Sequence, residues 1–324
     1  MKSDHLRFGI LGTARIAESV VPRMQATSIA SVTAVASRSQ ARAKDFAERH
    51  GIPIALEGYD QLIACPDVDA VYIPLPPSMH RDWTIRAAAA GKHVLCEKPL
   101  GCNAHQVDEM ISTCQQNNVV LLDGVMWYHT ARAQRLVEIA RSSELGEIRQ
   151  INSVFTFSGD QLAADNLQWN QELGGGALLD LGWYCVGATL LIKQCLPIRV
   201  SAFAKFRGDV DERMNGLMQF EDGSMASFEC GFDTVRRRWI EIAGTNASLV
   251  CSDFTKPWNP DQPTLRIVDG NGKGSTQVIP HPLQEECMID AFCKLAAEGT
   301  TEHAWLKLSR DTQYVCDLLA NAAT

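Results

Sequence analysis

Short apolar runs alternate with helix-like stretches along residues 6–122, and this alternation constrains the fold more than any other feature of the sequence. The apolar runs lie at 6–11, 31–36, 52–56, 70–73, 93–96 and 119–122. One helix pattern, 40–50, ends at Gly51, and another begins after Asn103, which suits a capping position. Strands and helices that alternate at this pitch predict an α/β fold with a parallel, doubly wound sheet.

The pattern changes after about residue 123. A helix at 131–141 and a long strand at 148–157 come first, and Gly174–Gly176 then opens an apolar helix that runs to about Gln194. Strands with little helix between them follow at 198–206, 214–220, 224–231, 236–243, 247–251, 264–269 and 277–279, before two helices at 284–298 and 309–322. This predicts a C-terminal α+β domain with a large, mostly antiparallel open sheet.

The chain of 324 residues is long for a single core, so we expect domains at 1–123 and 124–324, with the C-terminal helix free to pack back on the first. Its net charge of −8 argues against a nucleic-acid partner. No apolar stretch is expected to approach a membrane span, and residues 1–5 lead straight into a strand with no signal peptide. The eleven cysteines are scattered without metal-ligand spacing, which indicates reduced thiols in the cytoplasm and no metal site.

The turn after the first strand is a candidate phosphate-binding loop. Small residues at Ala14 and Ala17 occupy the later glycine positions of a degraded G-x-G-x-x-G pattern that begins at Gly12. Backbone N–H groups at the start of the following helix would meet a pyrophosphate. The alternative is a plain strand–helix turn. The candidate cofactor residues here are Gly12, Thr13, Ala14, Arg15 and Ile16.

The second strand ends in Ser37-Arg38-Ser39, with no acid where an NAD-type fold holds the ribose 2′-hydroxyl. Arg38 could pair with a 2′-phosphate, and Ser37 could donate to it. This favours NADP(H) over NAD(H). The alternative is a solvated arginine that opens the next helix.

The fourth strand is followed by Pro74-Leu75-Pro76-Pro77-Ser78-Met79-His80. We expect Ser78 to cap the helix that runs through Ala90, and His80 in its first turn to face the strand ends. An isolated histidine at such a place is more often an ordinary helix-start residue than a functional one.

Lys98 follows the strand at 93–96, within Glu97-Lys98-Pro99, where the proline ends the strand. Open α/β sheets bind their ligands at the carboxyl ends of strands, and burial can lower the pKa of a lysine. The alternative is a solvated charge beside a strand end.

Asp180 and Tyr184 are four residues apart on the helix that Gly174–Gly176 opens, so they are expected to share one face. A nearby Lys98 would keep Asp180 ionised and lower the pKa of Tyr184, which would make the phenol a proton donor and acceptor. The alternative is a buried tyrosine whose hydroxyl meets a backbone carbonyl.

Three segments together resemble the glucose–fructose oxidoreductase/inositol dehydrogenase (Gfo/Idh/MocA) family: 9–17, 89–99 and 174–184. The resemblance covers nearly the whole chain, and the middle segment is the most specific. Tyrosine at 184, where many members carry histidine, is similar to the branch of dimeric dihydrodiol dehydrogenases and NADP-dependent pentose dehydrogenases. The resemblance implies a Rossmann domain and a second domain whose open sheet forms a homo-oligomer interface.

The resemblance also implies roles for individual residues. Lys98 and Tyr184 would be the catalytic pair, and Asp180 their neighbour on the substrate side. The cofactor would be held by Gly12, Thr13, Ala14, Arg15, Ile16, Ser37, Arg38, Pro74, Leu75, Pro76, His80, Glu97 and Lys98. The substrate would meet Lys98, Asp180, Tyr184, Trp127 and Trp169, although tryptophans are more often core residues.

The chain departs from this branch at Tyr128 and Gln168, where relatives often carry arginine, and at Pro77, where asparagine is common. Two missing arginines put an anionic or arginine-clamped substrate in doubt and leave the hydride chemistry untouched. We therefore expect an NADP-dependent oxidoreductase acting on a sugar or cyclic polyol, with no membrane or nucleic-acid partner. The alternatives are a ketosugar reductase of a biosynthetic pathway and a non-catalytic NADP-binding regulator.

Overall fold

The computed structural model describes residues 5–323, apart from the side chain of Gln161. The first four residues, on which the expectation of no signal peptide partly rests, lie outside this range. Two compact units divide the chain. The first contains residues up to Val125 together with Glu285–Lys307, and the second contains Met126–Gln284 and residues from Leu308 onwards.

The first unit is built on a six-stranded parallel sheet with the order β3-β2-β1-β4-β5-β6. Its strands are β1 (Leu6–Leu11), β2 (Ala30–Ser37), β3 (Ile54–Glu57), β4 (Ala70–Ile73), β5 (His93–Cys96) and β6 (Leu121–Asp123). Its helices are α1 (Ala17–Ala26), α2 (Gln40–His50), α3 (Tyr59–Ile63), α4 (Pro77–Ala89), α5 (Ala104–Gln116) and α8 (Gln284–Glu298). The order reverses between β1 and β4, which is the point where doubly wound sheets bind dinucleotides.

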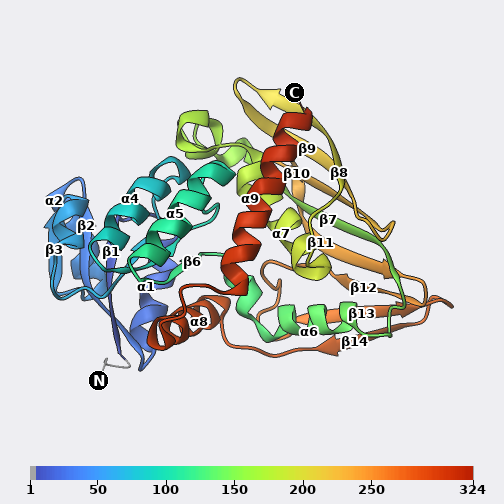
Figure 1. Ribbon diagram of the computed structural model, residues 1–324, viewed down its shortest axis with the longest axis horizontal. Helices are drawn as coiled ribbons and strands as arrows, with labels where there is room; N and C mark the ends of the chain where they lie inside the picture. The colour runs from blue at the N-terminus through green and yellow to red at the C-terminus, as the bar shows by residue number, and fades with distance from the viewer. Residues whose placement is uncertain (1–4, 324) are drawn as a thin grey trace. The chain divides into compact units, whose positions relative to one another are not determined.

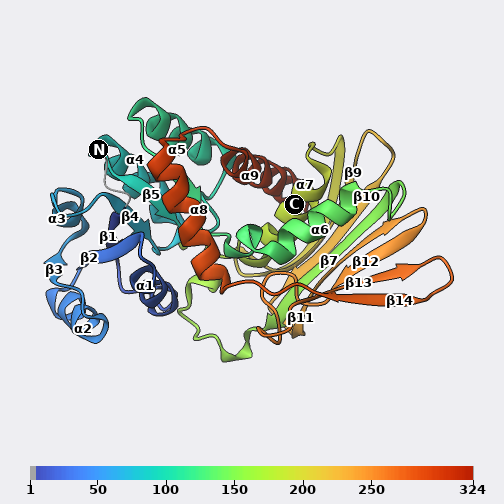
Figure 2. The same ribbon diagram turned by 90° about the horizontal axis from the view of Figure 1, so that it is seen from below.

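Helices cover both faces of this sheet. Figure 2 shows α4 and α5 on one face and α1 and α2 on the other. Helix α8 comes from the far end of the sequence, and its Phe292 ring lies 5.5 Å from Phe8 on β1. Phe8, Phe292 and the four residues of β4 are all buried, as expected for a sheet covered on both sides.

The second unit contains an eight-stranded sheet with the order β14-β13-β12-β11-β7-β10-β9-β8, in which only β7 and β10 are parallel (Figure 1). Its strands are β7 (Ile148–Ser158), β8 (Arg199–Arg207), β9 (Val210–Gln219), β10 (Met225–Gly231), β11 (Asp233–Gly244), β12 (Ala247–Cys251), β13 (Thr264–Asp269) and β14 (Gly274–Val278). These two sheets confirm the predicted fold class.

Helices cover one face of the second sheet. They are α6 (Ala131–Arg141), which contacts β12 and β13, and α7 (Trp183–Lys193), which contacts β7 and β10. Helix α9 (Ala304–Ala323) contributes its residues from Leu308 onwards to this unit. Short turns complete it, namely η1 (Met126–His129), η2 (Gly159–Gln161), η3 (Leu167–Trp169) and η4 (Gln171–Leu173).

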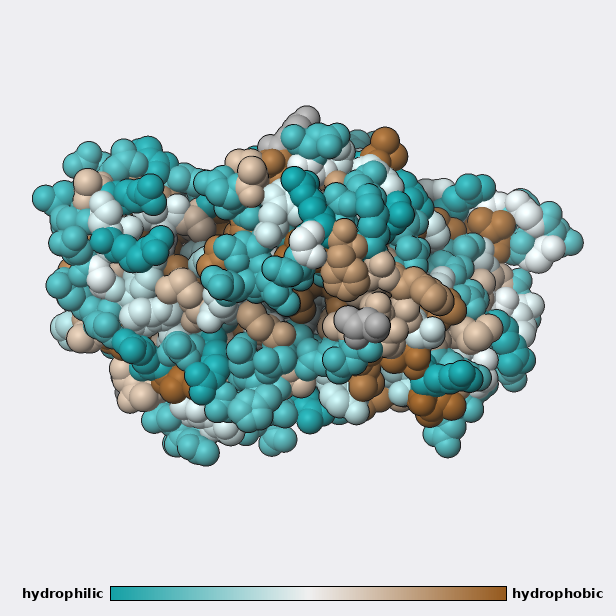
Figure 3. All heavy atoms as spheres, turned by 90° about the horizontal axis from the view of Figure 1, so that it is seen from above, coloured by the Kyte–Doolittle hydropathy of each residue, from teal (hydrophilic) through white to brown (hydrophobic). Residues whose placement is uncertain are grey.

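Hydrophobic side chains are exposed on β10, β9 and β8, the last three strands in the order of this sheet. Phe203 on β8 is 78% exposed, Leu217 on β9 is 55% exposed and Met225 on β10 is 51% exposed. Figure 3 shows hydrophobic side chains among polar ones on the surface of this unit. Large side chains of this kind on an open sheet indicate a surface that another chain can cover.

The helix predicted after Gly174–Gly176 is confirmed, and it begins with a π-helical turn, η5 (Leu178–Gly182), before α7. Two local predictions were wrong. Pro76, not Ser78, stands at the N-cap of α4, since Pro77 occupies the first helical position. Residues 171–193 are long and apolar enough to cross a membrane by length and composition alone, although 72% of the most apolar window is buried inside the protein.

Candidate functional site

The loop after β1 has the shape that a phosphate-binding turn needs. Gly12 has a φ of +104°, which a residue with a side chain rarely adopts, and a Cβ there would lie 3.0 Å from Cδ2 of Leu75. Helix α1 begins at Ala17, and the N–H groups of residues 13–16 make no hydrogen bond within residues 5–323. Donors that point out of a helix start are suited to a phosphate.

The carboxyl end of β2 carries the groups expected for the adenosine side of a cofactor. Arg38 is exposed, and the hydroxyl of Ser37 accepts a hydrogen bond of 3.3 Å from the Ser39 N–H. That leaves the Ser37 hydroxyl proton available as a donor. Burial raises the pKa of Tyr59, and the nearby positive charge of Arg38 opposes this rise.

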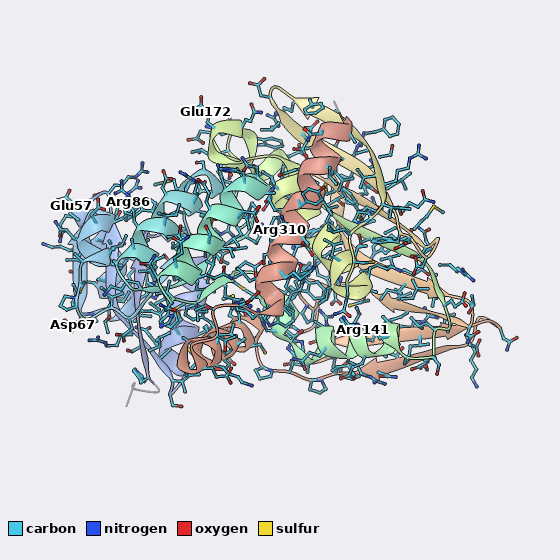
Figure 4. The ribbon with its side chains drawn as sticks, in the orientation of Figure 1. Glu57, Asp67, Arg86, Arg141, Glu172 and Arg310 are labelled. Carbon is cyan, nitrogen blue, oxygen red and sulfur yellow. The ribbon has the colours of Figure 1, made fainter. Side chains whose placement is uncertain are left out.

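An aromatic stack supports the same region. The rings of Tyr59 and Trp83 meet edge to face at 5.0 Å, and the guanidinium of Arg86 lies 4.9 Å from the Trp83 ring centroid. Arg86, labelled in Figure 4, is exposed and also donates to Asp60 at 2.9 Å. This stack fixes Tyr59 beside Gly12, since a Cβ on Gly12 would lie 3.6 Å from the Tyr59 hydroxyl.

His80 is fully buried and joins two segments of the candidate cofactor site. Its Nε2 lies 2.7 Å from the Leu75 carbonyl oxygen, and its Nδ1 lies 2.9 Å from the carbonyl oxygen of Pro99. Burial lowers the pKa of His80, the contacts with the backbone carbonyls oppose this, and the charge of Lys98 lowers it further. Both ring nitrogens therefore face the chain itself, so His80 acts on the site by fixing Leu75 and Pro99.

Lys98 follows β5 and is half-buried, and the peptide bond between it and Pro99 is cis. The carboxylate of Glu97 accepts a 2.6 Å hydrogen bond from the Tyr72 hydroxyl and a 3.3 Å bond from the Lys98 N–H. Burial raises the pKa of Glu97, while the Tyr72 hydroxyl and the Lys98 charge lower it. Gly124 leaves room for this carboxylate, because a Cβ there would lie 2.9 Å from it.

Asp180 lies on the π-helical turn η5, and Tyr184 is the second residue of α7. Asp211 on β9 caps this helix, since its carboxylate accepts a 2.6 Å hydrogen bond from the Leu178 N–H. Gly176 has a φ of +111°, and a Cβ on it would collide with the Asp211 carboxylate. Burial raises the pKa of Asp211 to about 6, against the lowering effect of the backbone N–H groups. π-Helical turns of this kind are frequent at functional sites.

Three side chains that the sequence analysis missed form a series of contacts that begins at Tyr184. The Phe155 ring lies 5.4 Å from the Tyr184 ring, and the Arg238 guanidinium lies 5.8 Å from the Phe155 ring centroid. The same guanidinium lies 4.5 Å from the ring of Trp258. The only sequence signal for this group was the alternation along two strands, which places Phe155 and Arg238 on one face once their register is known.

Both tryptophans proposed for the substrate are packed against other side chains of the second unit. The Trp127 ring is buried and meets Phe254 edge to face at 5.3 Å. The Trp169 ring meets Phe232 at 5.3 Å and lies under the guanidinium of Arg207 at 4.1 Å. The indole N–H group of each is buried and has no hydrogen-bond partner in the described part of the chain.

Each unit therefore brings some of the predicted site residues together. The first unit brings together Gly12 with Leu75, and His80 with Pro99 and the Lys98 segment. The second unit places Asp180 and Tyr184 on one capped helix. Among residues 5–323, no group of three or more His, Cys, Asp and Glu side chains could hold a metal ion.

Two family models match the chain. The first describes an oxidoreductase family with an NAD-binding Rossmann fold (GFO_IDH_MocA) and matches residues 6–125. The second describes a GFO/IDH/MocA C-terminal domain and matches residues 133–250.

Named relatives and a solved structure agree with these matches. The chain is 38% identical over 247 residues to D-xylose 1-dehydrogenase (NADP(+)) 2 from Haloferax volcanii, which covers 75% of each protein. It is 31% identical to trans-1,2-dihydrobenzene-1,2-diol dehydrogenase from Sus scrofa, over 83% of this chain and 79% of the relative. The structure of KijD10, a 3-ketoreductase from Actinomadura kijaniata in complex with NADP and TDP-benzene, matches with a TM-score of 0.92, 29% identity and 98% of each chain covered.

Proposed function

Because this chain belongs to the Gfo/Idh/MocA family of oxidoreductases, we propose that it is an NADP-dependent enzyme that oxidises a hydroxyl, or reduces a carbonyl, on a sugar or cyclic polyol. The first unit binds the cofactor and the second binds the substrate. The observation that carries the proposal is the position of two side chains. Lys98 follows the carboxyl end of β5, and Tyr184 lies on the capped helix. By this proposal Lys98 and Tyr184 are the two side chains that handle the proton and the developing charge of the reaction.

The residues of the first unit suit NADP(H). The unpaired N–H groups of residues 13–16 receive the pyrophosphate, and Gly12 gives it room to approach the backbone. Arg38 and Ser37 take the 2′-phosphate, since no acid stands at the end of β2 to repel it. NADP also appears in the name of the xylose dehydrogenase and in the description of the KijD10 complex.

The bound cofactor supplies or accepts the hydride, and the chain moves the proton. In the oxidation direction Tyr184 takes the proton of the substrate hydroxyl, and the Lys98 ammonium stabilises the negative charge that develops on the substrate oxygen and the tyrosinate. Asp180, one helical turn away, orients both groups. In the reduction direction the same Tyr184 hydroxyl donates its proton to the carbonyl oxygen.

Replacing Lys98 tests this assignment. We expect Lys98→Met to bind NADPH as the wild type does and to lower kcat by a factor on the order of 10² or more, because a preorganised charge is lost from the reacting centre. The measurements are NADPH fluorescence titration and steady-state rates. Lys44→Met, on the exposed side of α2, is the matched control and should leave both unchanged. Near-normal turnover in Lys98→Met would reject the assignment.

A second candidate function is reduction of a ketosugar in a biosynthetic pathway. The likeness to the 3-ketoreductase KijD10 over 98% of the chain favours it. Parallel assays with aldopentoses and NADP⁺, and with ketosugars and NADPH, separate the two functions by their kcat/KM values. A protein that binds NADPH and turns over no member of either panel would instead be a non-catalytic regulator.

The second unit is also where we place a homo-oligomer interface. The exposed Phe203, Leu217 and Met225 on β8, β9 and β10 would be covered by a second copy of the chain. Light scattering should give a mass of at least twice that of one chain, and a monomeric mass would contradict this.

Because most of the eleven free thiols are buried, we assign the enzyme to the reducing cytoplasm.

A further inference from the structure

We infer that Arg238 determines the substrate specificity of this site, and that it selects a sugar carrying an anionic group such as a carboxylate or phosphate. The inference rests on the proposed function, because it assigns Arg238 to the same site as Tyr184. It reverses the doubt raised by Tyr128 and Gln168, which stand where relatives often carry arginine.

Arg238 lies on the same face of the sheet as the catalytic helix. On β11 it alternates with buried Ile240 and Ile242, and it stands opposite Phe155 on β7 in the antiparallel register. Phe155 lies between the two functional groups, with the Tyr184 ring at 5.4 Å and the Arg238 guanidinium at 5.8 Å. The separation between the phenol ring and the guanidinium therefore cannot exceed the sum of these two distances.

The guanidinium is held in one orientation. It stacks on Trp258 at 4.5 Å, and its Nη2 donates to the carbonyl oxygen of Lys256. The backbone N–H of Trp258 in turn donates to the Asp253 carboxylate, which also forms a 2.7 Å ion pair with buried Arg132. A cation fixed in this way loses little conformational entropy when a ligand binds.

Among residues 5–323, no carboxylate forms an ion pair with the Arg238 guanidinium, and its Nε–H is buried without an acceptor. Asp253, whose charge opposes the lowering of the Arg238 pKa by burial, is already engaged by Arg132, and Arg236 adds a further positive charge. Sheltering a cation from water without a partner is costly, so an anionic substrate group would complete the site.

The chemistry of the site then fixes the arrangement of the substrate. The reacting carbinol lies at Tyr184, and the anionic group lies on the far side of Phe155, where the Nη atoms of the guanidinium have N–H donors beyond the one that Lys256 accepts. A neutral sugar would leave this cation without a partner. Sugar acids and sugar phosphates share the required chemistry, and only a direct comparison separates them.

The test compares D-glucose, D-glucuronate and D-glucose 6-phosphate as substrates with saturating NADP⁺. We expect the wild type to favour at least one anionic sugar over glucose in kcat/KM. Arg238→Gln should lower kcat/KM for that anionic sugar about 10- to 100-fold, the size of one lost hydrogen bond to a charged group, and change the value for glucose by less than about threefold. Arg238→Lys keeps the positive charge without the paired N–H donors of the guanidinium. It should retain part of the preference for the anionic sugar. Arg266→Gln, on the exposed side of β13, is the matched control.

Two outcomes would overturn the inference. An equal loss on glucose and on the anionic sugars would assign Arg238 to the general electrostatics of Tyr184, and a wild type without anionic preference would remove the basis of the proposal. If no sugar reacts, the proposed function fails separately, and calorimetric titration of glucuronate and glucose 6-phosphate into the NADP⁺-loaded protein still decides. Binding lost in Arg238→Gln supports the inference, and no binding to the wild type overturns it. If Arg238→Gln does not fold, Arg238→Lys decides: a lower kcat/KM for the anionic sugar with an unchanged value for glucose supports the inference, and equal losses on both overturn it.

Discussion

At the scale of single residues, burial and hydrogen bonding set the chemistry that each side chain can perform. The Glu97 carboxylate is held by the Tyr72 hydroxyl and the Lys98 N–H, so it fixes the start of the lysine segment. His80 fixes the other end of the same segment through the Pro99 carbonyl. Neither residue needs to touch a substrate to matter, because the position of the Lys98 backbone depends on both.

Arg38 carries the prediction for cofactor choice. It is exposed at the end of β2, and its charge is felt by the buried hydroxyl of Tyr59. We expect Arg38→Ala to lower kcat/KM for NADP⁺ about 10- to 100-fold, the value of a charge-assisted contact, and to change that for NAD⁺ by only a few-fold. Arg42→Ala, at an exposed position in the first turn of α2, is the control. Equal effects on both cofactors would remove Arg38 from the 2′-phosphate site.

Single residues also show how far sequence reasoning reaches. Lys98, Asp180 and Tyr184 could be proposed as site residues because each belongs to a short segment whose pattern indicates a local structure. Arg238, Phe155 and Trp258 could not be found, because their proximity depends on the register of β7 with β11 and on the conformation of the loop before β13. Long-range register is set by tertiary packing, and a single sequence does not report it.

At the scale of elements, the helix that carries Asp180 and Tyr184 begins irregularly. The sequence predicted a helix opened by glycines, and the structure adds the reason for Gly176: only a residue without a Cβ lets the Asp211 carboxylate reach the first N–H groups. The π-helical turn that follows could not be predicted from spacing, because the apolar pattern of 177–193 suits a regular helix equally well. The cap comes from β9, more than thirty residues away.

The Asp211 cap predicts a pH dependence of stability. Burial raises the Asp211 pKa to about 6 in the folded protein, so the folded chain binds this proton more tightly than the unfolded chain. Its contribution is fully present below about pH 4 and is lost as the pH rises through 6. A shift of about two pKa units corresponds to on the order of 3 kcal/mol at most.

Asp211→Asn isolates this contribution, since the amide oxygen can still accept from the Leu178 N–H. We expect the melting temperature of the wild type, relative to the variant, to fall between about pH 4 and pH 7. Calorimetric scans of both proteins at several pH values measure the difference. A difference that stays constant across this range would mean that Asp211 does not titrate there.

At the scale of the whole molecule, the chain divides into two units of different architecture. The strand order β3-β2-β1-β4-β5-β6 places the ends of β1, β4 and β5 together, which is why Gly12, Leu75 and Lys98 belong to one region although they are far apart in sequence. The alternation of strands and helices was enough to predict this sheet. The sequence could not predict that α8 belongs to the first unit, because its amphipathic pattern suits the hydrophobic core of either unit.

The central claim is that the Lys98 ammonium from one unit and the Tyr184 phenol from the other act on the same reacting oxygen. A double-mutant cycle with Lys98→Met, Tyr184→Phe and the double variant tests this claim. The quantity compared is the rate constant of hydride transfer, measured in single-turnover experiments. Groups that act as a unit give strongly non-additive losses, so we predict that the double variant is about as slow as the slower single variant. Losses that multiply, with the double variant slower than either by the product of the two factors, would contradict the account.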